Sequence, residues 1–422
     1  MNIKIILTMP TVLAVTAFAD PIVIAGKNIP RLLGKPIASI VVLNGSGTAI
    51  PFQIDEVTKD GEYVLDKGES PNVKEGNGVL NEQDEIAFLW NDADAVDAEA
   101  GVNKGIGTNI NNNDIDSNIK TTITLTRGKE KRTVTVVFDP TSSLPRSPRS
   151  YIGYNHNTGR VATEYYYADF AKDRFHFVRA GVMDFTSNKY VDLTNELRVE
   201  ILLKTLFGLI PIRYGEGDLV CFVRRYKVGP IRLIRRGDFH LNLGFGVKGS
   251  RAAVNQICYP KVVKVPVYVH LPIRFRNLFS QAHIEMTPVI REAGKRFTFA
   301  VPSNKLYFPV GGDRLDTLCQ SMPLRRMFTL KNGDAAGYGW ILDATTQPEH
   351  ISGSGFVMRR PGTRGTGPAE CGFRLTVRDV PKGNYYITNW VLFSGGKAGD
   401  IERLGKGLME PVAVSEEKYG EH

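Results

Sequence analysis

The chain alternates apolar and polar residues over short segments, and this period of two constrains its fold more than any other feature. In one segment, Phe239, Leu241, Leu243 and Phe245 fall on one face of an extended chain and His240 on the other. Segments of the same kind span residues 121–126, 132–138, 265–271, 296–301, 373–377 and 385–393. Glycine and proline, with 42 and 23 copies, punctuate the chain, and apolar stripes of helical period are scarce. The sequence therefore predicts an all-β protein of sandwich architecture with few helices, and residues 192–206 are the most ambiguous segment.

The first residues have the pattern of a secretory signal peptide. A start that carries Lys4 is followed by an uncharged, mostly apolar run from Ile5 and by the small-x-small exit Ala17-Phe18-Ala19. The alternative, a membrane anchor, needs about 20 apolar residues, and this run is shorter. We expect residues 1–19 to be removed and the product to be exported, to the periplasm, the cell surface or the medium. No later run is apolar and long enough to predict an integral membrane segment.

Charge divides the mature chain into two regions. Residues 55–99 hold 14 acidic residues and three lysines, whereas residues 219–283 hold 12 Lys and Arg and one acidic residue, Asp238. A Pro/Ser-rich stretch at 139–150 suggests a boundary between them. We therefore predict several domains: an acidic N-terminal β domain at 20–140, a large basic β-sandwich at 151–415 and a charged tail at 416–422.

Four cysteines, Cys221, Cys258, Cys319 and Cys371, are an even number for an oxidising compartment. Two disulfides are therefore expected, with three pairings open. Buried free thiols are the alternative. The wide spacing excludes Cys-x-x-Cys redox motifs and zinc ribbons.

Residues 223–236 place six basic side chains on what is expected to be a strand pair. This basic ribbon supplies the candidate ligand-binding residues Arg224, Arg225, Arg232, Arg235 and Arg236. Three interpretations compete: the ribbon docks against the acidic region, it faces an anionic partner such as a polysaccharide, lipid headgroups or another exported protein, or it lines an enzyme site. Nucleic acid is not expected for an exported chain without a nucleic-acid-binding signature.

No diagnostic catalytic motif is present. The chain lacks the Gly-x-Ser-x-Gly, His-Glu-x-x-His, Walker and dinucleotide-binding patterns, so whether it is an enzyme stays open. The catalytic candidates are Tyr165, Tyr167, His176 and His240, because in a polysaccharide lyase Arg would neutralise a uronate carboxylate while Tyr or His removes the adjacent proton. Two further histidines are of interest. His270 lies opposite an apolar face, and His283 shares a strand face with Glu285.

Asn91, Asp92 and Asp94 offer oxygen ligands at close spacing, which is the chemistry that calcium prefers. The full calcium-loop pattern is absent, and a solvated acidic loop is the favoured interpretation. No other cofactor is expected.

Two sequence stretches resemble known families. The residues Pro-Phe-Gln-Ile-Asp-Glu at 51–56, with Asp-Glu-Ile-Ala-Phe-Leu at 84–89, resemble a strand-turn-strand unit of secreted bacterial β proteins. The stretch Gly-Pro-Ile-Arg at 229–232 resembles a strand of mutarotase-like supersandwiches, a fold shared by many carbohydrate-active enzymes. The resemblance implies export and a large supersandwich-like second domain, and it transfers no active site.

These observations favour an exported binding or scaffolding protein with a basic, aromatic-rich groove for an anionic partner, either a polysaccharide or another envelope protein. The alternative is a carbohydrate-active enzyme, a polysaccharide lyase or glycoside hydrolase, that acts on an acidic polysaccharide.

Overall fold

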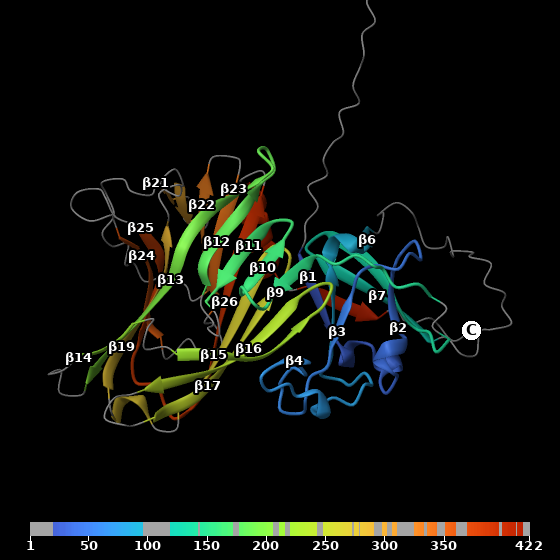
Figure 1. Cartoon of the computed structure of the whole chain (residues 1–422), viewed down its shortest axis with the longest axis horizontal. Coiled ribbons are helices and arrows are strands. Elements are labelled where there is room, and N and C mark those ends of the chain that lie inside the picture. Colours follow the sequence, from blue (N-terminus) through green and yellow to red (C-terminus); the bar gives the residue numbers. More distant parts are fainter. Residues whose placement is uncertain are drawn as a thin grey trace, which may run out of the picture.

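The computed structural model describes residues 20–95, 119–141, 144–171, 177–205, 211–215, 220–242, 248–271, 274–277, 279–290, 298–301, 306–309, 325–332, 336–343, 351–359, 369–395, 399–410 and 412–416. Within these residues the protein is an all-β structure of several sheets. Figure 1 shows a small body of N-terminal strands beside a larger body that holds most of the chain. The predicted leader, residues 1–19, lies outside the described residues.

The small body contains two sheets that share one apolar core. The first has the strand order β1-β5-β3 and the second the order β2-β8-β7-β27, with β6 paired to β8. Ile24, Phe88, Trp90 and Val136 are buried between them. The strands are β1 (Pro21–Ala25), β2 (Ile40–Asn44), β3 (Gln53–Asp55), β5 (Glu85–Leu89), β6 (Asp94–Ala95), β7 (Ile119–Arg127), β8 (Glu130–Phe138) and β27 (Ala413–Glu416). The short 3-10 helices of this region are η1 (Gly26–Asn28), η2 (Pro30–Leu32), η3 (Ile37–Ser39), η4 (Val73–Glu75) and η5 (Trp90–Asp92).

The large body is built from two long antiparallel sheets. The nine-stranded sheet has the order β24-β25-β19-β13-β12-β11-β10-β9, with β14 paired to β13. Its strands are β9 (Ile152–Asn155), β10 (Arg160–Thr163), β11 (Tyr166–Phe170), β12 (Phe177–Asp184), β13 (Lys189–Thr205), β14 (Pro211–Tyr214), β19 (Phe279–Ile290), β24 (Ile351–Arg359) and β25 (Ala369–Val377).

The ten-stranded sheet has the order β21-β20-β22-β23-β26-β18-β17-β16-β15-β4. Its strands are β4 (Lys67–Gly68), β15 (Val220–Val228), β16 (Leu233–Asn242), β17 (Lys248–Cys258), β18 (Val262–Leu271), β20 (Thr298–Val301), β21 (Leu306–Pro309), β22 (Arg325–Asn332), β23 (Ala336–Asp343) and β26 (Gly383–Gly395). Among the described residues of the large body, one 3-10 helix is present, η8 (Phe275–Asn277).

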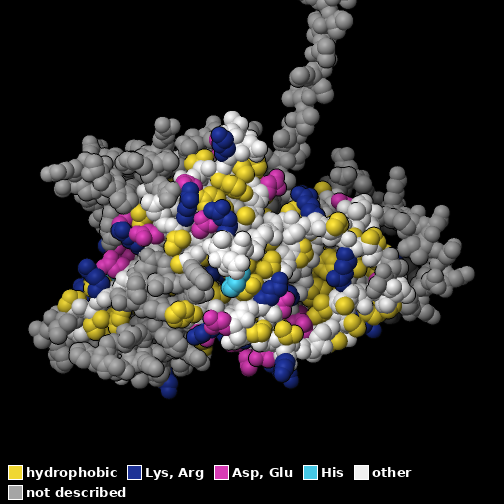
Figure 2. Space-filling model, in the orientation of Figure 1, with side chains coloured by type: hydrophobic (Ala, Val, Ile, Leu, Met, Phe, Trp, Pro, Cys, Tyr) yellow, Lys and Arg dark blue, Asp and Glu magenta, His cyan; other side chains and the backbone are white. Residues whose placement is uncertain are grey.

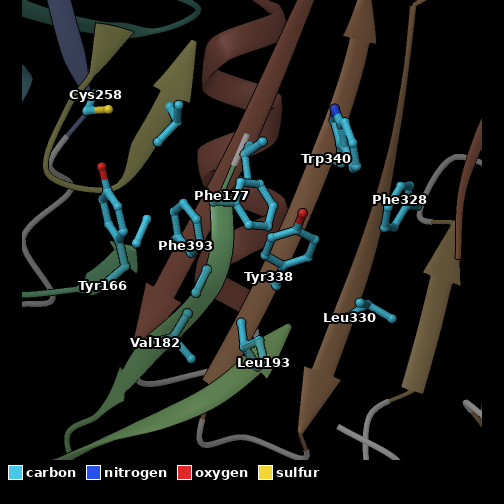
Figure 3. Close-up of a cluster of buried hydrophobic side chains, with 14 of the residues drawn as sticks. Tyr166, Phe177, Val182, Leu193, Cys258, Phe328, Leu330, Tyr338, Trp340 and Phe393 are labelled. Carbon is cyan, nitrogen blue, oxygen red and sulfur yellow. The ribbon is translucent and has the colours of Figure 1, made fainter. Parts of the chain in front are cut away.

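Apolar side chains from both long sheets interdigitate in one core (Figure 3). Tyr166 of β11 stacks on Phe393 of β26, with ring centroids 4.1 Å apart. Farther along the sandwich, the ring centroid of Phe373 of β25 lies 5.1 Å from that of Phe328 of β22 and 5.9 Å from that of Trp340 of β23. The two sheets are therefore joined face to face as a sandwich, which is the architecture that the alternating pattern predicts.

Two short strands cross between the bodies. Strand β4, from the acidic region, pairs with β15 at the edge of the ten-stranded sheet. Strand β27 pairs with β7 of the small body, although it comes from the C-terminal end of the chain. The predicted bound of the large domain at residue 415 is thereby corrected, because Ala413–Glu416 completes the N-terminal sheet.

The α-helix of the described residues, α1 (Gly399–Met409), packs on the outside of the ten-stranded sheet. It buries Ile401 and Leu404. A Cβ atom at Gly337 would lie 3.3 Å from the side chain of Ile401, so glycine at this position of β23 allows the helix to approach closely. No helix among the described residues is long and apolar enough to cross a bilayer.

The strand predictions are confirmed where the structure describes them, and the ambiguous segment 192–206 falls almost wholly within the long strand β13. The expectation of two disulfides is corrected. Cys258 and Cys371 are buried free thiols, so at most the two other cysteines remain for pairing. Burial raises the pKa of Cys258 to about 12, which leaves its thiol protonated and unreactive at neutral pH. The side chains of Cys221 and Cys319 lie outside the described residues.

Replacing Phe373 by Ala is expected to lower the free energy of unfolding by about 3–5 kcal/mol, because it opens a cavity between the sheets. The control is Phe185→Ala, at a position 43% exposed, where we expect a loss of less than about 1 kcal/mol. Urea titration followed by circular dichroism measures both. Equal losses in the two variants would contradict the assigned core.

Candidate functional site

The basic ribbon, β15 and β16 with their connecting turn, is covered by the acidic N-terminal body. Glu62 pairs with Arg225 at 2.7 Å and also with Arg236. The other ion pairs across this contact are Asp55 with Lys227 at 2.8 Å, Asp55 with Arg232 at 2.7 Å, Glu85 with Arg232 at 2.7 Å and Glu69 with Arg224 at 2.9 Å. Of the three interpretations of the ribbon, the structure shows the first, docking against the acidic region.

Arg232 is the centre of this contact. Its Nε donates to Asp55 at 2.8 Å, its Nη2 to Glu85 at 2.7 Å and its Nη1 to the Tyr259 hydroxyl at 2.9 Å. Arg232 is 1% exposed and Asp55 is fully buried. Burial raises the pKa of Asp55, but the charges of Arg232 and Lys227 outweigh it, and the pKa lies below its ordinary value. The carboxylate therefore stays ionised inside the interface.

The two sequence stretches that carry the resemblances meet in this contact. Gln53 and Asp55 belong to the first stretch, and Gly229 and Arg232 belong to the second. The Gln53 Oε1 accepts the backbone N–H of Arg232 at 3.0 Å, and its amide donates to Asp55. A Cβ at Gly229 would lie 2.0 Å from this Gln53 oxygen, so a larger residue would displace it. Both stretches therefore have a structural role at the interface.

An external ligand does not reach the innermost arginines of the ribbon. Arg232 and Arg235 are each 1% exposed and Arg236 is 8% exposed. Arg235 lies inside the sandwich, 4.1 Å from the ring centroid of Phe170, and donates to Gln256 at 2.6 Å. The assignment of Arg232, Arg235 and Arg236 to a ligand groove is therefore corrected, because these side chains are buried and have partners within the protein. Figure 2 shows basic and acidic side chains interspersed on the face in view.

The predicted catalytic tyrosines do not meet. Tyr167 lies on the outer face of the nine-stranded sheet, where its hydroxyl donates to Asp192 and Arg160 lies 4.8 Å from its ring centroid. Tyr165 instead packs against the apolar cluster outside the ten-stranded sheet, with the Lys261 ammonium 4.2 Å from its ring centroid. His176 lies outside the described residues, as do the side chains of His240 and His270.

The calcium candidates are engaged within the protein. The Asp92 carboxylate accepts the Tyr151 hydroxyl at 2.7 Å, and that of Asp94 accepts the backbone N–H of Ser46 at 2.7 Å. The Asn91 amide nitrogen is buried without a hydrogen-bond acceptor. In the part of the chain that the structure describes, no three His, Cys, Asp or Glu side chains group as metal ligands. The carboxylates of Asp92 and Asp94 therefore have partners within the protein, and a calcium site at these residues stays a prediction.

A cavity of about 350 Å³ lies in the small body. Its lining includes the carboxylates of Glu56, Glu75 and Glu82 and the ammonium of Lys59. The Glu56 carboxylate accepts the backbone N–H groups of Asn77 and Gly78, each at 2.8 Å. An excess of negative charge makes this cavity a poor fit for an anionic ligand.

The polar cluster that best fits chemistry or binding lies on the outer face of the nine-stranded sheet. His283 and Glu285 share this face of β19, as the sequence predicts, and stand opposite Thr376 and Arg374 of β25. The Nδ1 of His283 lies 3.1 Å from the Thr376 Oγ1, and the Nε of Arg374 donates to Glu285 at 2.6 Å. Glu285 is 7% exposed, whereas His283 is partly exposed.

Positive charge surrounds this histidine. Burial lowers the pKa of His283, and the charges of Lys204 and Arg374 lower it further, against the opposing effect of Glu285. Arg378 acts in the same direction as Lys204, and both side chains are exposed. At neutral pH the imidazole is therefore uncharged and lies in a basic setting, where a proton acceptor and an anion-binding surface coincide.

Sequence reasoning missed Arg374 and Thr376. The alternation of residues 373–377 places these two on one face, but only the register of β25 against β19 brings them to His283 and Glu285. On the neighbouring strand β13, Glu200 stands opposite Glu285 and forms an ion pair with Arg213 at 2.9 Å.

Comparison with known proteins finds no matching family model and no matching curated protein. Among solved structures, the chain is similar to an alpha-mannosidase from Enterococcus faecalis V583, with a TM-score of 0.45 and 7% identity over 91% of this chain and 42% of that one. It is also similar to a glycosyl hydrolase family 38 protein from Enterococcus faecalis, with a TM-score of 0.45 and 6% identity over 95% of this chain and 46% of that one. The chain spans less than half the length of these proteins, and likeness of this extent assigns no activity.

Replacing Arg232 by Met is expected to cost about 3–5 kcal/mol of unfolding free energy, because the buried charge of Asp55 loses its principal partner. The matched control is Arg224→Met, since that ion pair is exposed and we expect a change below about 1 kcal/mol. Denaturant titration at neutral pH measures both variants. A small loss for Arg232→Met would show that the interface does not depend on this contact.

Proposed function

We propose that the protein is an exported binding protein for an acidic polysaccharide, and that the ligand lies on the outer face of β13, β19 and β25. The observation that carries the proposal is the set of basic side chains on this face, where Lys204 of β13, Arg374 of β25 and the adjacent Arg378 lie around His283, and Arg374 is also paired with Glu285. Carboxylate or sulfate groups of a polysaccharide would complement that charge. The basic ribbon is occupied by the contact between the two bodies. We therefore place the anion-binding site on this face of the nine-stranded sheet instead.

A lyase activity is the second candidate, favoured by the uncharged state of His283. In the tautomer that carries its proton on Nδ1 and donates it to Thr376, the Nε2 of His283 is the nitrogen that accepts a proton. It would take the proton next to the uronate carboxylate, whose charge Lys204 would neutralise, since Arg374 is paired with Glu285. The electron pair of that C–H bond forms a C=C bond as the glycosidic C–O bond at the neighbouring carbon breaks. The leaving oxygen then takes a proton from water.

The double variant Lys204→Gln/Arg378→Gln tests the binding site without disturbing the core, because both side chains are exposed. We expect affinity for an acidic polysaccharide such as polygalacturonate to fall about three- to tenfold at low salt, as two exposed charges are lost. The control, Lys189→Gln/Arg403→Gln, removes two exposed charges elsewhere and should leave affinity unchanged. Isothermal calorimetry at two salt concentrations measures both. Equal affinity of the two double variants would contradict the proposed site.

The pH dependence separates binding from lyase activity. As pH falls through the lowered pKa of His283, the imidazole gains a positive charge, so binding of a polyanion should strengthen. Elimination should instead slow, because the protonated imidazole is no longer a base. Ultraviolet absorbance of unsaturated sugar products measures elimination, and His283→Gln should abolish it. Absence of absorbance across a panel of uronate polymers would reject the lyase and leave binding.

A further inference from the structure

A second feature of the large body lies beside the interface and apart from the site around His283. Strands β18 and β26 present three cross-strand pairs in a row on one face: Lys264 with Trp390, Pro266 with Thr388 and Tyr268 with Tyr386. Their neighbours Val265, Val391 and Ile387 point into the sandwich core. The row therefore lies on the outer face of the ten-stranded sheet. Four residues along β18 separate its ends, which is about 13 Å of strand.

The far end of this row is aromatic and exposed. The ring centroids of Tyr268 and Tyr386 lie 4.9 Å apart, and Tyr386 is 52% exposed. Each ring stands on a paired strand of a long sheet, so its position is set by the backbone. A tyrosine ring offers an apolar face together with a hydroxyl, the combination that packs against a sugar ring.

The near end holds a partly buried lysine beside a tryptophan ring. The Lys264 ammonium lies 4.9 Å from the ring centroid of Trp390. Within the described residues it has no ion pair, whereas its neighbours on this face, Arg225 and Arg236, both pair with Glu62. Burial lowers the pKa of Lys264, and the charge of Arg232 acts in the same direction while Glu85 opposes it. A bound carboxylate would supply the missing partner.

We infer that this row, Lys264, Trp390, Tyr268 and Tyr386, is a second binding site for an acidic glycan, which we call the seat. In it the tyrosines stack on sugar rings and Lys264 binds a carboxylate. The inference rests on the proposed function, since it assumes the same class of ligand. A protein partner fits less well, because a stable protein interface buries roughly 1,200–2,000 Å² in total, and this row is two strands wide. The row borders the apolar cluster that covers the same sheet face near the small body.

Tryptophan fluorescence reports on this seat selectively. The chain has three tryptophans, of which Trp90 and Trp340 are 2% and 1% exposed, whereas Trp390 is only partly buried. Acrylamide should therefore quench Trp390 above the others. We expect short oligogalacturonates to protect the mature protein from quenching, and a neutral galacto-oligosaccharide of the same length to protect it less.

Two variants test the assigned residues. Lys264→Gln should raise the oligogalacturonate concentration that gives half-maximal protection about tenfold, since it removes a charge-assisted hydrogen bond. Tyr386→Ala should raise the same concentration several-fold. The matched control, Lys120→Gln, changes an exposed lysine of the small body and should leave protection unchanged. Unaltered quenching with oligogalacturonate, or equal protection of Lys264→Gln and the parent, would overturn the seat. Equal protection by a short polyglutamate would show that the occupant is not a glycan and would also overturn it.

The same titration distinguishes the two proposals. If Lys204→Gln/Arg378→Gln weakens polysaccharide binding while Trp390 is never protected, the seat is wrong and the proposed function stands. If Trp390 is protected and only the Lys264 and Tyr386 variants lose binding, the seat stands and the site around His283 is wrong.

Discussion

The buried pairing of Arg232 with Asp55 and Glu85 is the interaction on which the arrangement of the protein depends. Moving a guanidinium and a carboxylate out of water costs several kcal/mol per ion, so such a pair persists only where further hydrogen bonds complete it. Here Gln53 and Tyr259 complete it. Since Asp55 comes from the small body and Arg232 from the large one, burial of the charges is possible only when the two bodies are docked. The pair therefore selects one relative placement of the domains.

This contact also withdraws most basic side chains of the ribbon from solvent. Docking pairs both Arg225 and Arg236 with the single carboxylate of Glu62, and it removes Arg232 from solvent. Among the described residues, Lys204, Arg374 and Arg378 lie near His283 on the nine-stranded sheet, and Lys264 lies on the outer face of the ten-stranded sheet. Both faces consist of paired strands, which hold side chains in set positions with little entropy left to lose on binding.

Much of the fold follows from local pattern, and the exceptions have physical causes. Alternation identifies β7, β8, β18 and β26, because each has one face in a core and one outside. Helix α1 is missed, since Gly405 and Gly407 weaken its intrinsic propensity, and it is held by packing of Ile401 against a glycine surface on β23. The free state of Cys258 and Cys371 is likewise invisible in their spacing. In the polar cluster, the alternation of residues along the chain already places His283 and Glu285 on one face. That Arg374 and Thr376 join them follows only from the register of β25 against β19.

By itself the sequence determines the β class and the opposite charges of two regions, because each depends on residue type and on neighbours along the chain; the leader stays a prediction of the same kind. Only the tertiary structure decides that those charges satisfy one another. Whether Arg232 meets Asp55 or an external carboxylate depends on positions 177 residues apart, and the physical chemistry of the two pairings is the same. The choice between an open basic groove and a closed domain interface is therefore made by the docking of the two bodies.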